Sequence, residues 1–323
     1  MNIYFFNAFH NGDIHYSRTF VSNMIKDISK IHPDTNFFYY HKNPPECILD
    51  IENLQHIPYN EMKTGDIHRI RFYAEGDDIY INTWIGCWKI SCVNDMMVHP
   101  QNEFRYIEVE PGGCTISGNE VLYQDTYDDM LNYFGIKLEL PSTNECIPRI
   151  DYSHYHIKEI DKHIEETKDK FRKRIFISNG ITLSGQSLNF NFDQIIYDVA
   201  PLYPDCAFYM TSEVPYSQEL LPNVYNTRNI IGYDGCDLNE NSYLSTKCDY
   251  IVGRASGPFA FSLVQENYMD KNKTICVISN NKFEGFWYDG GEVQYDWINT
   301  SGWTENITTM SIVKDKLIEF CER

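Results

Sequence analysis

Ile3-Tyr4-Phe5-Phe6, with Asn11-Gly12-Asp13 a few residues further on, is the stretch of sequence that decides the fold. The apolar run predicts a buried strand, and Asn11-Gly12-Asp13 predicts a turn. Apolar residues then recur at helical spacing between Phe20 and Ile31, which predicts an amphipathic helix ending at His32-Pro33-Asp34. Because open α/β folds bind ligands at the carboxyl ends of their strands, Asp13 stands where chemistry is usually done.

The composition indicates a globular protein with two cores. The chain has 323 residues, of which 42% are hydrophobic and 15% aromatic, and this length predicts two domains. A net charge of −19 argues against nucleic-acid partners, because phosphate backbones need clustered Lys and Arg. We find neither a leader-like segment nor an apolar run near the roughly 20 residues of a membrane span, and the ten cysteines are scattered. We therefore expect a cytoplasmic protein with reduced cysteines and no integral membrane segment.

Strands and helices are expected to alternate in the first half, residues 1–150. Further strands are predicted at 37–40 and 78–82, with weaker ones at 56–57 and 106–109, and a helix over 122–134 is closed by Gly135. The periodicity breaks between 141 and 155, which places the domain boundary there. A highly charged helix over 157–173 follows and is interpreted as a solvated connector.

The second half, residues 151–323, restarts the same pattern. Helices are predicted over 193–202 and from Pro258, and strands are predicted at 174–178, 206–210, 229–231, 249–252 and 274–278. Two halves with this βα alternation indicate an α/β fold with two Rossmann-like domains. The default site of such a protein is the cleft across which its domains face each other.

Asp13 has two interpretations. A carboxylate before a helix caps the free N–H groups and favours the positive end of the helix dipole. The functional interpretation is a general base at the end of a strand, which accepts a proton from an acceptor hydroxyl. His10 and His15 flank Asp13 and either tune that role or make polar loop contacts.

The segment from Gly253 to Pro258 is the second candidate. It follows a predicted strand and reads Gly253-Arg254-Ala255-Ser256-Gly257-Pro258. A small-residue turn with a proline at the start of a helix forms an anion site from backbone N–H groups, which favours a diphosphate. Arg254 adds a positive charge. The alternative is a tight turn that needs only its glycine.

Two further loops follow predicted strands. Asn179-Gly180 and Ser184-Gly185-Gln186-Ser187 come after the strand at 174–178, so they either contact phosphate or sugar hydroxyls at the same edge or form a plain surface loop. The stretch from Gly232 to Asp237 follows the strand predicted at 229–231. Its Tyr233 offers a ring for a nucleobase, and the alternative is an ordinary turn.

Several patterns argue against other function classes. The chain has no G-x-G-x-x-G after its first strand and no G-x-x-x-x-G-K-[ST], which argues against a dinucleotide dehydrogenase and a P-loop NTPase. Cys87 and Cys92 have no matching second pair, so a zinc site is not expected. The acidic run from Glu75 to Asp78 precedes its apolar strand, whereas an acidic metal clamp follows one. It is therefore interpreted as a solvated turn.

The first motif resembles the opening of the heptosyltransferase-type GT-B glycosyltransferases. In that family a Gly-Asp turn follows the first strand, as Asn11-Gly12-Asp13 does here, and a helix then leads to a second strand. In the second half, the run from Asp249 to Gly253 leads into Ser256-Gly257, which is similar to the family's donor turn. The family usually carries Asp-Thr-Gly followed by a histidine in that turn.

This chain departs from the family pattern in the donor turn. It has Ala255-Ser256-Gly257, with Phe259 or Ala260 near the position of the histidine. Arg254 is then expected to compensate by contacting phosphate.

The resemblance implies a GT-B fold and a metal-independent glycosyltransferase of the hexosyl or heptosyl type that works in glycan biosynthesis. A sugar would move from a nucleotide diphosphate to a hydroxyl of a glycan or lipid-linked saccharide, without a further cofactor. Inversion with Asp13 as the general base is expected. The alternatives are a nucleotide-sugar epimerase of the same fold and a non-catalytic sugar-binding or scaffold protein. The acceptor-side residues would be His10, Asn11, Gly12 and His15, and the donor-binding residues would be Asn179, Gly180, Ser184, Gly185, Gln186, Ser187, Tyr233, Arg254, Ser256 and Gly257.

Overall fold

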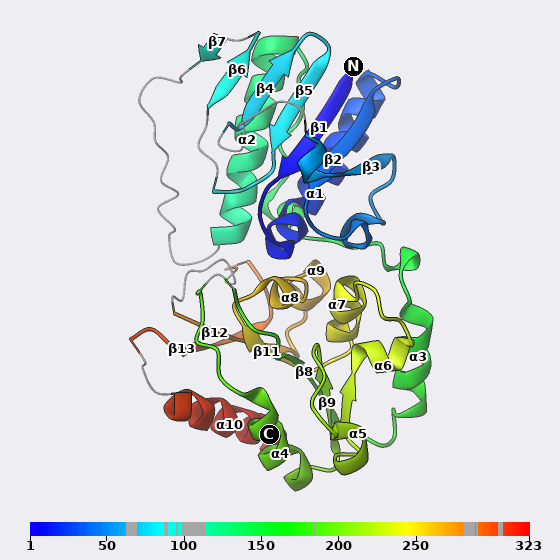
Figure 1. Ribbon diagram of the computed structural model, residues 1–323, viewed down its shortest axis with the longest axis vertical. Coiled ribbons are helices and arrows are strands. Elements are labelled where there is room, and N and C mark those ends of the chain that lie inside the picture. Colours follow the sequence, from blue (N-terminus) through cyan, green and yellow to red (C-terminus); the bar gives the residue numbers. More distant parts are fainter. Residues whose placement is uncertain are drawn as a thin grey trace. The chain divides into compact units, whose positions relative to one another are not determined.

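The chain forms two compact units, Met1–Asp151 and Tyr152–Arg323 (Figure 1). Each unit is built on a sheet whose strands are mostly or entirely parallel, so the α/β class expected from the sequence is confirmed. The computed structural model describes residues 1–62, 70–86, 90–94, 96–98, 114–183, 185–280, 288, 290–302 and 306–323. The strand predicted at 106–109 lies outside the described residues.

The first unit contains a seven-stranded sheet in the order β3-β2-β1-β5-β4-β6-β7. The strands β3, β2, β1 and β5 are parallel, whereas β4 runs antiparallel to β5. The strand bounds are β1 Asn2–Asn7, β2 Asn36–His41, β3 Leu54–Pro58, β4 Phe72–Glu75, β5 Asp78–Asn82, β6 Ser91–Val93 and β7 Met96–Val98. The strands predicted at 37–40, 56–57 and 78–82 are therefore confirmed.

The α-helices in the described part of the first unit are α1, Asn11–Ile31, and α2, Cys114–Phe134, which lie side by side on one face of the sheet (Figure 1). Ile3 and Phe5 of β1 are fully buried. The described part of this unit also contains the 3-10 turns η1 Pro45–Ile48, η2 Tyr59–Glu61 and η3 Thr143–Cys146. Gly135 ends α2 at φ +66, as predicted, because this left-handed conformation costs glycine little.

The second unit contains a fully parallel six-stranded sheet in the order β10-β9-β8-β11-β12-β13. This is the strand order of the doubly wound Rossmann fold, which reverses direction between β8 and β11. The strand bounds are β8 Lys173–Ser178, β9 Cys206–Met210, β10 Val224–Asn226, β11 Tyr250–Arg254, β12 Thr274–Ser279 and β13 Gln294–Asn299.

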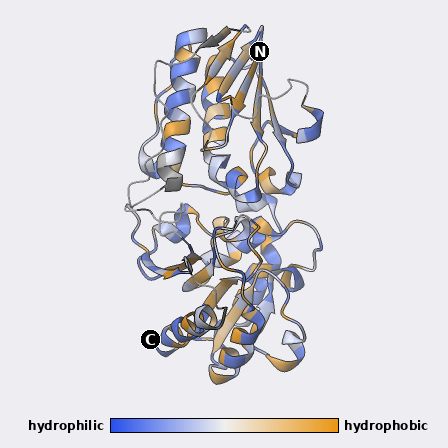
Figure 2. Cartoon of the chain, turned by 60° about the vertical axis from the view of Figure 1, so that its left-hand side comes forward, coloured by the Kyte–Doolittle hydropathy of each residue, from blue (hydrophilic) through white to orange (hydrophobic). Residues whose placement is uncertain are grey.

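Short helices connect these strands, and the longest described helix of the unit is α10 near the carboxyl end of the chain. All residues of β9, β11 and β12 are buried, whereas the edge strand β13 is mostly half-buried or exposed, and Figure 2 shows the hydrophobic stretches in orange. The bounds are η4 Tyr152–His154, α3 Ile157–Glu166, α4 Phe192–Val199, η5 Ala200–Leu202, α5 Ser217–Leu220, α6 Thr227–Ile231, α7 Leu238–Thr246, α8 Gly257–Ala260, α9 Gln265–Tyr268 and α10 Asn306–Glu322. In the described part of the chain, no helix combines the length and the apolar character that crossing a bilayer requires.

The structure corrects several element predictions. Residues 229–231 are helical and belong to α6, because Asn226 caps the first turn with its side chain and Gly232 ends it at φ +63. The charged helix stops at Glu166, and the segment up to Lys173 is a series of turns before β8. The strand at 274–278 does not close the series, because β13 and α10 follow it.

Two corrections concern the candidate motifs. Asn11-Gly12-Asp13 is the first turn of α1 and not a turn before it, with His10 as the N-cap residue. Gly253 and Arg254 are the last residues of β11, and the turn after them is shorter than expected. The helix that contains Pro258 is a single turn of four residues, α8.

Candidate functional site

The second sheet brings three of the predicted donor residues, Asn179, Gly180 and Arg254, together where the strand order reverses. The loop after β8 begins at Asn179, and Arg254 ends the neighbouring strand β11. Arg254 joins the two, since its Nη1 donates to the carbonyl oxygens of Asn179 at 2.7 Å and Gly180 at 2.8 Å. Its Nη2 donates to the carbonyl of Phe190 at the other end of the loop. The crevice at such a reversal is the usual ligand site of open α/β sheets.

The Arg254 side chain is buried, with only 1% of it exposed. Its guanidinium carbon lies 4.3 Å from the centre of the Phe190 ring and 4.6 Å from that of Phe192. Burial lowers the pKa of Arg254 to about 10, so the side chain remains charged at neutral pH. Because its amino groups donate to backbone carbonyls, Arg254 fixes the course of the loop. Direct phosphate contact, which the sequence suggested, would compete with these bonds.

Ser256 is also engaged within the fold. Its hydroxyl accepts a hydrogen bond from the backbone N–H of Phe259 at 3.4 Å, and it thereby caps the single turn of α8. Gly257 is the first residue of that turn. One helical turn aligns few peptide dipoles, so the anion site that the sequence predicts here is weaker than at a full helix.

A close backbone approach explains Gly253. A Cβ atom at this position would lie 2.6 Å from Cβ of Ser178 in β8 and 2.6 Å from Cδ2 of Phe259 in α8. The glycine therefore lets β8, β11 and α8 pack closely next to Arg254, whose guanidinium bonds to the loop after β8.

Polar side chains of neighbouring strand ends hold the rest of this loop. The amide of Asn179 donates to the carbonyl of Ser212 at 3.0 Å, and its oxygen accepts the Ser212 N–H at 2.7 Å. Asn280 lies directly after β12. Its amide nitrogen donates to the carbonyl of Gly185 at 2.8 Å, and its amide oxygen accepts a hydrogen bond from the Thr300 hydroxyl at 2.6 Å. The loop is thus tied to both neighbours of β8 and to the far strands.

The remaining predicted loop residues occupy different surroundings. The carbonyl of Gln186 accepts the Asn280 N–H at 2.8 Å, Ser187 is buried, and Ser184 lies outside the described residues. Tyr233 lies in the loop after α6, where its ring stacks on that of His156 at 4.4 Å. Its ring face is therefore covered on one side by a histidine.

Sequence reasoning missed a hollow after β9. It has a volume of about 240 Å³ and is lined by residues 213–217 and 219, together with Asn226 and Asn229. Tyr216 has a left-handed backbone, with φ +57, and its side chain is 74% exposed. This conformation is costly for a bulky residue, and residues in such conformations cluster at functional sites. The available signal was the polar Thr211-Ser212-Glu213 directly after a buried strand.

In the first unit, Asp13 caps the helix that begins beside it. Its Oδ2 accepts the backbone N–H of His10 at 3.1 Å, from the third position of α1. Burial raises the pKa of Asp13, and the hydrogen bond from the His10 backbone opposes this rise. The capping interpretation is therefore correct, and a carboxylate with a raised pKa is also a stronger base than an exposed aspartate.

Buried polar groups lie at the same strand ends, beneath α1. The Tyr39 hydroxyl lies 2.9 Å from the Ser17 hydroxyl and 2.7 Å from that of Thr83, which also accepts the Asn7 amide at 3.2 Å. Burial raises the pKa of Tyr39, and the Asp13 charge adds to the rise. This chain of hydroxyls connects β1, β2, β5 and α1 next to Asp13.

The other acceptor-side residues differ in exposure. His10 is exposed, whereas Gly12 and His15 are buried in the first turns of α1, and Asn11 is partly exposed.

His41, at the end of β2, is fully buried. Burial and the neighbouring His56 lower the pKa of His41 to about 3. Among the described residues, no group of three or more His, Cys, Asp or Glu side chains is arranged to hold a metal ion.

Comparisons with known proteins find distant structural similarity. No family model and no curated protein matches the chain. A glycosyl transferase family 9 protein from Veillonella parvula DSM 2008 is similar at 10% identity, with a TM-score of 0.47 over 98% of this chain and 89% of that chain. The E. coli heptosyltransferase WaaC with ADP aligns at 9% identity, with a TM-score of 0.46 over 100% and 98%. The glycotransferase of kitacinnamycin aligns at 11% identity, with a TM-score of 0.43 over 100% and 91%.

Proposed function

We propose that this protein transfers a sugar from a nucleotide diphosphate to a hydroxyl acceptor, with the unit Tyr152–Arg323 holding the donor. The observation that carries the proposal is the pinned loop at the strand reversal, where Arg254 joins Asn179 and Gly180 to the end of β11. Open α/β sheets bind their ligands in the crevice outside the carboxyl ends of the strands, at such a reversal. The sequence resemblance to heptosyltransferase-type enzymes agrees with this assignment.

In this proposal the nucleoside occupies the hollow after β9. The Tyr216 ring is largely exposed on a left-handed backbone, and it offers a surface on which the base can stack. Glu213 lines the same hollow and offers a carboxylate for the ribose hydroxyls. The diphosphate then lies toward the loop that begins at Asn179.

The charge that develops on the leaving diphosphate needs stabilisation without a metal ion. Arg254 supplies a fixed positive charge behind the loop, and the loop's backbone N–H groups supply the direct hydrogen bonds. Arg254 is therefore a positioning residue in this scheme. Loss of transfer on adding EDTA would contradict the metal-independent form of the proposal.

Asp13 of the unit Met1–Asp151 is the proposed general base. With Oδ2 held by the His10 N–H, Oδ1 takes the proton of the acceptor hydroxyl. The acceptor oxygen forms a bond to the anomeric carbon while the bond from that carbon to the diphosphate oxygen breaks. The nucleoside diphosphate leaves with the electron pair, and the single displacement inverts the anomeric centre.

A panel of nucleoside diphosphates and their sugar conjugates tests the donor assignment by thermal shift. A ligand that binds the folded state raises the melting temperature, by an amount that grows with its concentration. We expect at least one conjugate to stabilise the chain, and Glu213→Gln to reduce that shift. No shift with any member of the panel would overturn the proposal.

Product analysis separates transfer from the other candidates. Conversion of the donor to a second nucleotide sugar without an acceptor would indicate an epimerase. A binding protein without catalysis is the second candidate, favoured by the engagement of Arg254 and Ser256 in structural bonds. Donor binding without hydrolysis, transfer or epimerisation would identify it.

A further inference from the structure

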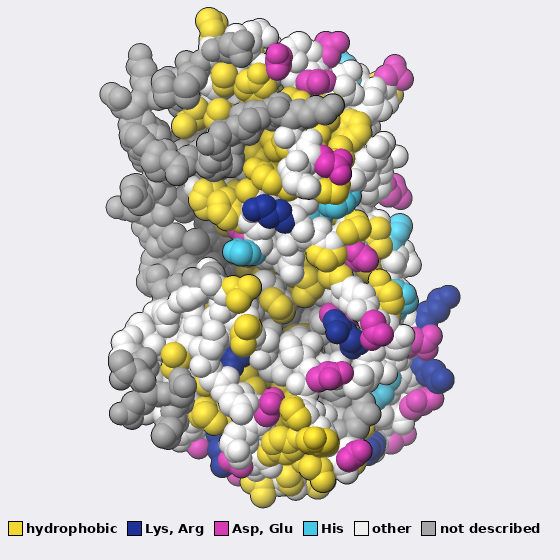
Figure 3. Space-filling view, in the orientation of Figure 1, with side chains coloured by type: hydrophobic (Ala, Val, Ile, Leu, Met, Phe, Trp, Pro, Cys, Tyr) yellow, Lys and Arg dark blue, Asp and Glu magenta, His cyan; other side chains and the backbone are white. Residues whose placement is uncertain are grey.

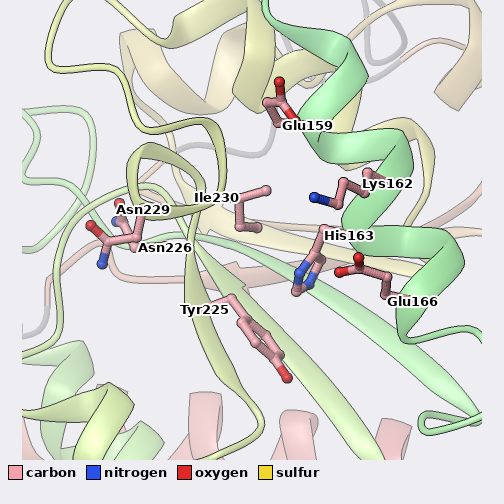
Figure 4. A pocket seen from close by; sticks show the side chains of 8 residues that line it. All are labelled: Glu159, Lys162, His163, Glu166, Tyr225, Asn226, Asn229 and Ile230. Atoms are coloured by element: carbon pink, nitrogen blue, oxygen red, sulfur yellow. The ribbon is translucent and has the colours of Figure 1, made fainter.

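A second hollow, beside the edge strand β10, lies between one face of α3 and residues of β10 and α6 (Figure 4). Its volume is about 280 Å³. At roughly 30 Å³ for each water molecule, this is room for about nine waters, and it is enough for one sugar ring. It belongs to the unit Tyr152–Arg323 alone and neighbours the hollow after β9, because Asn226 and Asn229 line both.

The charged side chains of α3 that line this hollow do not pair with one another. Glu159, Lys162 and Glu166 are spaced three and four residues apart, a spacing that normally allows ion pairs along a helix. The same spacing does produce an ion pair in another helix of the chain, between Lys30 and Asp27 of α1. Within the described ranges, no ion pair or hydrogen bond engages the three charged groups around the hollow. They are therefore available to a ligand.

Figure 4 shows how these groups are arranged. The Lys162 ammonium extends from α3 toward Ile230 on the opposite wall, and the Glu166 carboxylate lies beside the His163 ring. The Tyr225 hydroxyl donates a hydrogen bond to the Pro222 carbonyl at 3.1 Å. The Tyr225 ring and Ile230 thus supply apolar surface, whereas α3 supplies the polar groups.

The net charge of the lining is negative. Burial lowers the pKa of His163, whose Nε2 lies 3.3 Å from the Tyr209 hydroxyl, so its imidazole is neutral at neutral pH. The two negative charges of Glu159 and Glu166 then exceed the single positive charge of Lys162. Figure 3 shows both Lys or Arg and Asp or Glu side chains on the visible face of this unit. Lys170 is not part of the lining, but its ammonium donates to the Tyr225 hydroxyl at 3.3 Å. Within the lining itself, the two carboxylates exceed the one ammonium. A phosphate group is disfavoured here.

We propose that this hollow binds a neutral saccharide as a subsite separate from the nucleotide donor. The two carboxylates accept hydrogen bonds from sugar hydroxyls, and Lys162 donates to a sugar oxygen. The Tyr225 ring and Ile230 contact the C–H face of the sugar. The inference does not depend on sugar transfer, because it rests on the chemistry of this lining alone.

Ligand-observed NMR titration of the full chain with D-glucose, D-galactose and N-acetyl-D-glucosamine tests the proposal. We expect at least one sugar to bind, and both Lys162→Ala and Glu166→Gln to weaken that binding at least tenfold. Lys158→Ala is the matched control, because Lys158 lies one turn earlier on α3 and does not line the hollow. It should leave the affinity unchanged.

Three results would overturn the proposal. They are the absence of binding by all three sugars, an equal loss of affinity in the Lys158→Ala control, and Lys162-dependent binding of inorganic diphosphate. The thermal shift by nucleotide sugars should persist in Lys162→Ala. Failure of the saccharide site is therefore distinguishable from failure of the proposed transferase activity.

Discussion

Arg254 and Asn179 are joined across two parallel strands, with the Arg254 guanidinium donating to the Asn179 carbonyl at 2.7 Å. One side chain at the end of β11 thereby positions the loop that follows β8. The bonded atoms on the loop are all backbone oxygens, since the carbonyls of Gly180 and Phe190 complete the set. These three bonds, from Arg254 to Asn179, Gly180 and Phe190, form the Arg254 clamp.

Replacing Arg254 should destabilise the second unit. Arg254→Ala leaves three buried or half-buried carbonyls without a charged donor, and we expect a loss of about 3 kcal/mol in the free energy of unfolding. Arg254→Lys keeps the charge but loses the planar fork, so it should recover only part of this loss. Urea denaturation measures both. The exposed Arg323→Ala should cost less than about 1 kcal/mol, and an equal effect there would contradict the clamp.

Gly253→Ala should destabilise the fold by about 2 kcal/mol, because the new Cβ atom must displace Ser178 and Phe259 from 2.6 Å. Gly180→Ala is the control, since its Cβ atom would meet only the Ser212 hydroxyl at 3.6 Å. The shift of the urea midpoint decides the comparison. Equal midpoints for the two variants would show that β11 has room to move.

Asp13→Asn should lower kcat for sugar transfer by about 10²- to 10⁴-fold, which is the usual contribution of a general base. The amide retains the size of the carboxyl group, so stability should change little. Because burial raises the Asp13 pKa above its ordinary 3.8, the wild-type rate should fall with acidification at a pH above that value. A variant with unchanged kcat would remove Asp13 from the mechanism.

His41 should make the first unit less stable in mild acid. Its pKa falls from 6.5 to about 3 on folding, so protons bind the unfolded chain more readily, and stability present above pH 6.5 is lost as the pH falls toward 3. Between pH 7 and pH 5 this amounts to about 2 kcal/mol. His41→Phe should flatten the dependence measured by denaturation at each pH. A pH dependence in His41→Phe equal to that of the wild type would exclude His41 as its cause.

Strong periodic signals made most of the sheet predictable. The buried runs that became β1, β2, β5, β8, β9, β11 and β12 are long and apolar, so burial and strand formation agree. The run at 229–231 was predicted wrongly because three residues cannot distinguish strand from helix. Its two caps, Asn226 and Gly232, carried the deciding information.

The site was less predictable than the sheet. Sequence position placed Arg254 correctly at a strand end, but its partners are backbone carbonyls of a distant segment, which carry no signature in residue type. Asp13 shows the same limit, because a helix cap and a catalytic base require the same carboxylate at the same place. The hollow after β9 depends on the unusual backbone of Tyr216, which the sequence alone does not indicate.

The Arg254 clamp bonds only to main-chain carbonyls of the loop and, in the described part of the loop, makes no hydrogen bond to its side chains. Substitutions of the exposed Ile181 and Leu183 can therefore change the groups presented to a ligand, while Arg254 and the Asn189 side chain hold the path of the loop. Such a separation of scaffold from contact surface makes this segment a natural place to alter donor preference. A library confined to Ile181 and Leu183, with Arg254 left intact, should yield folded variants at a high rate.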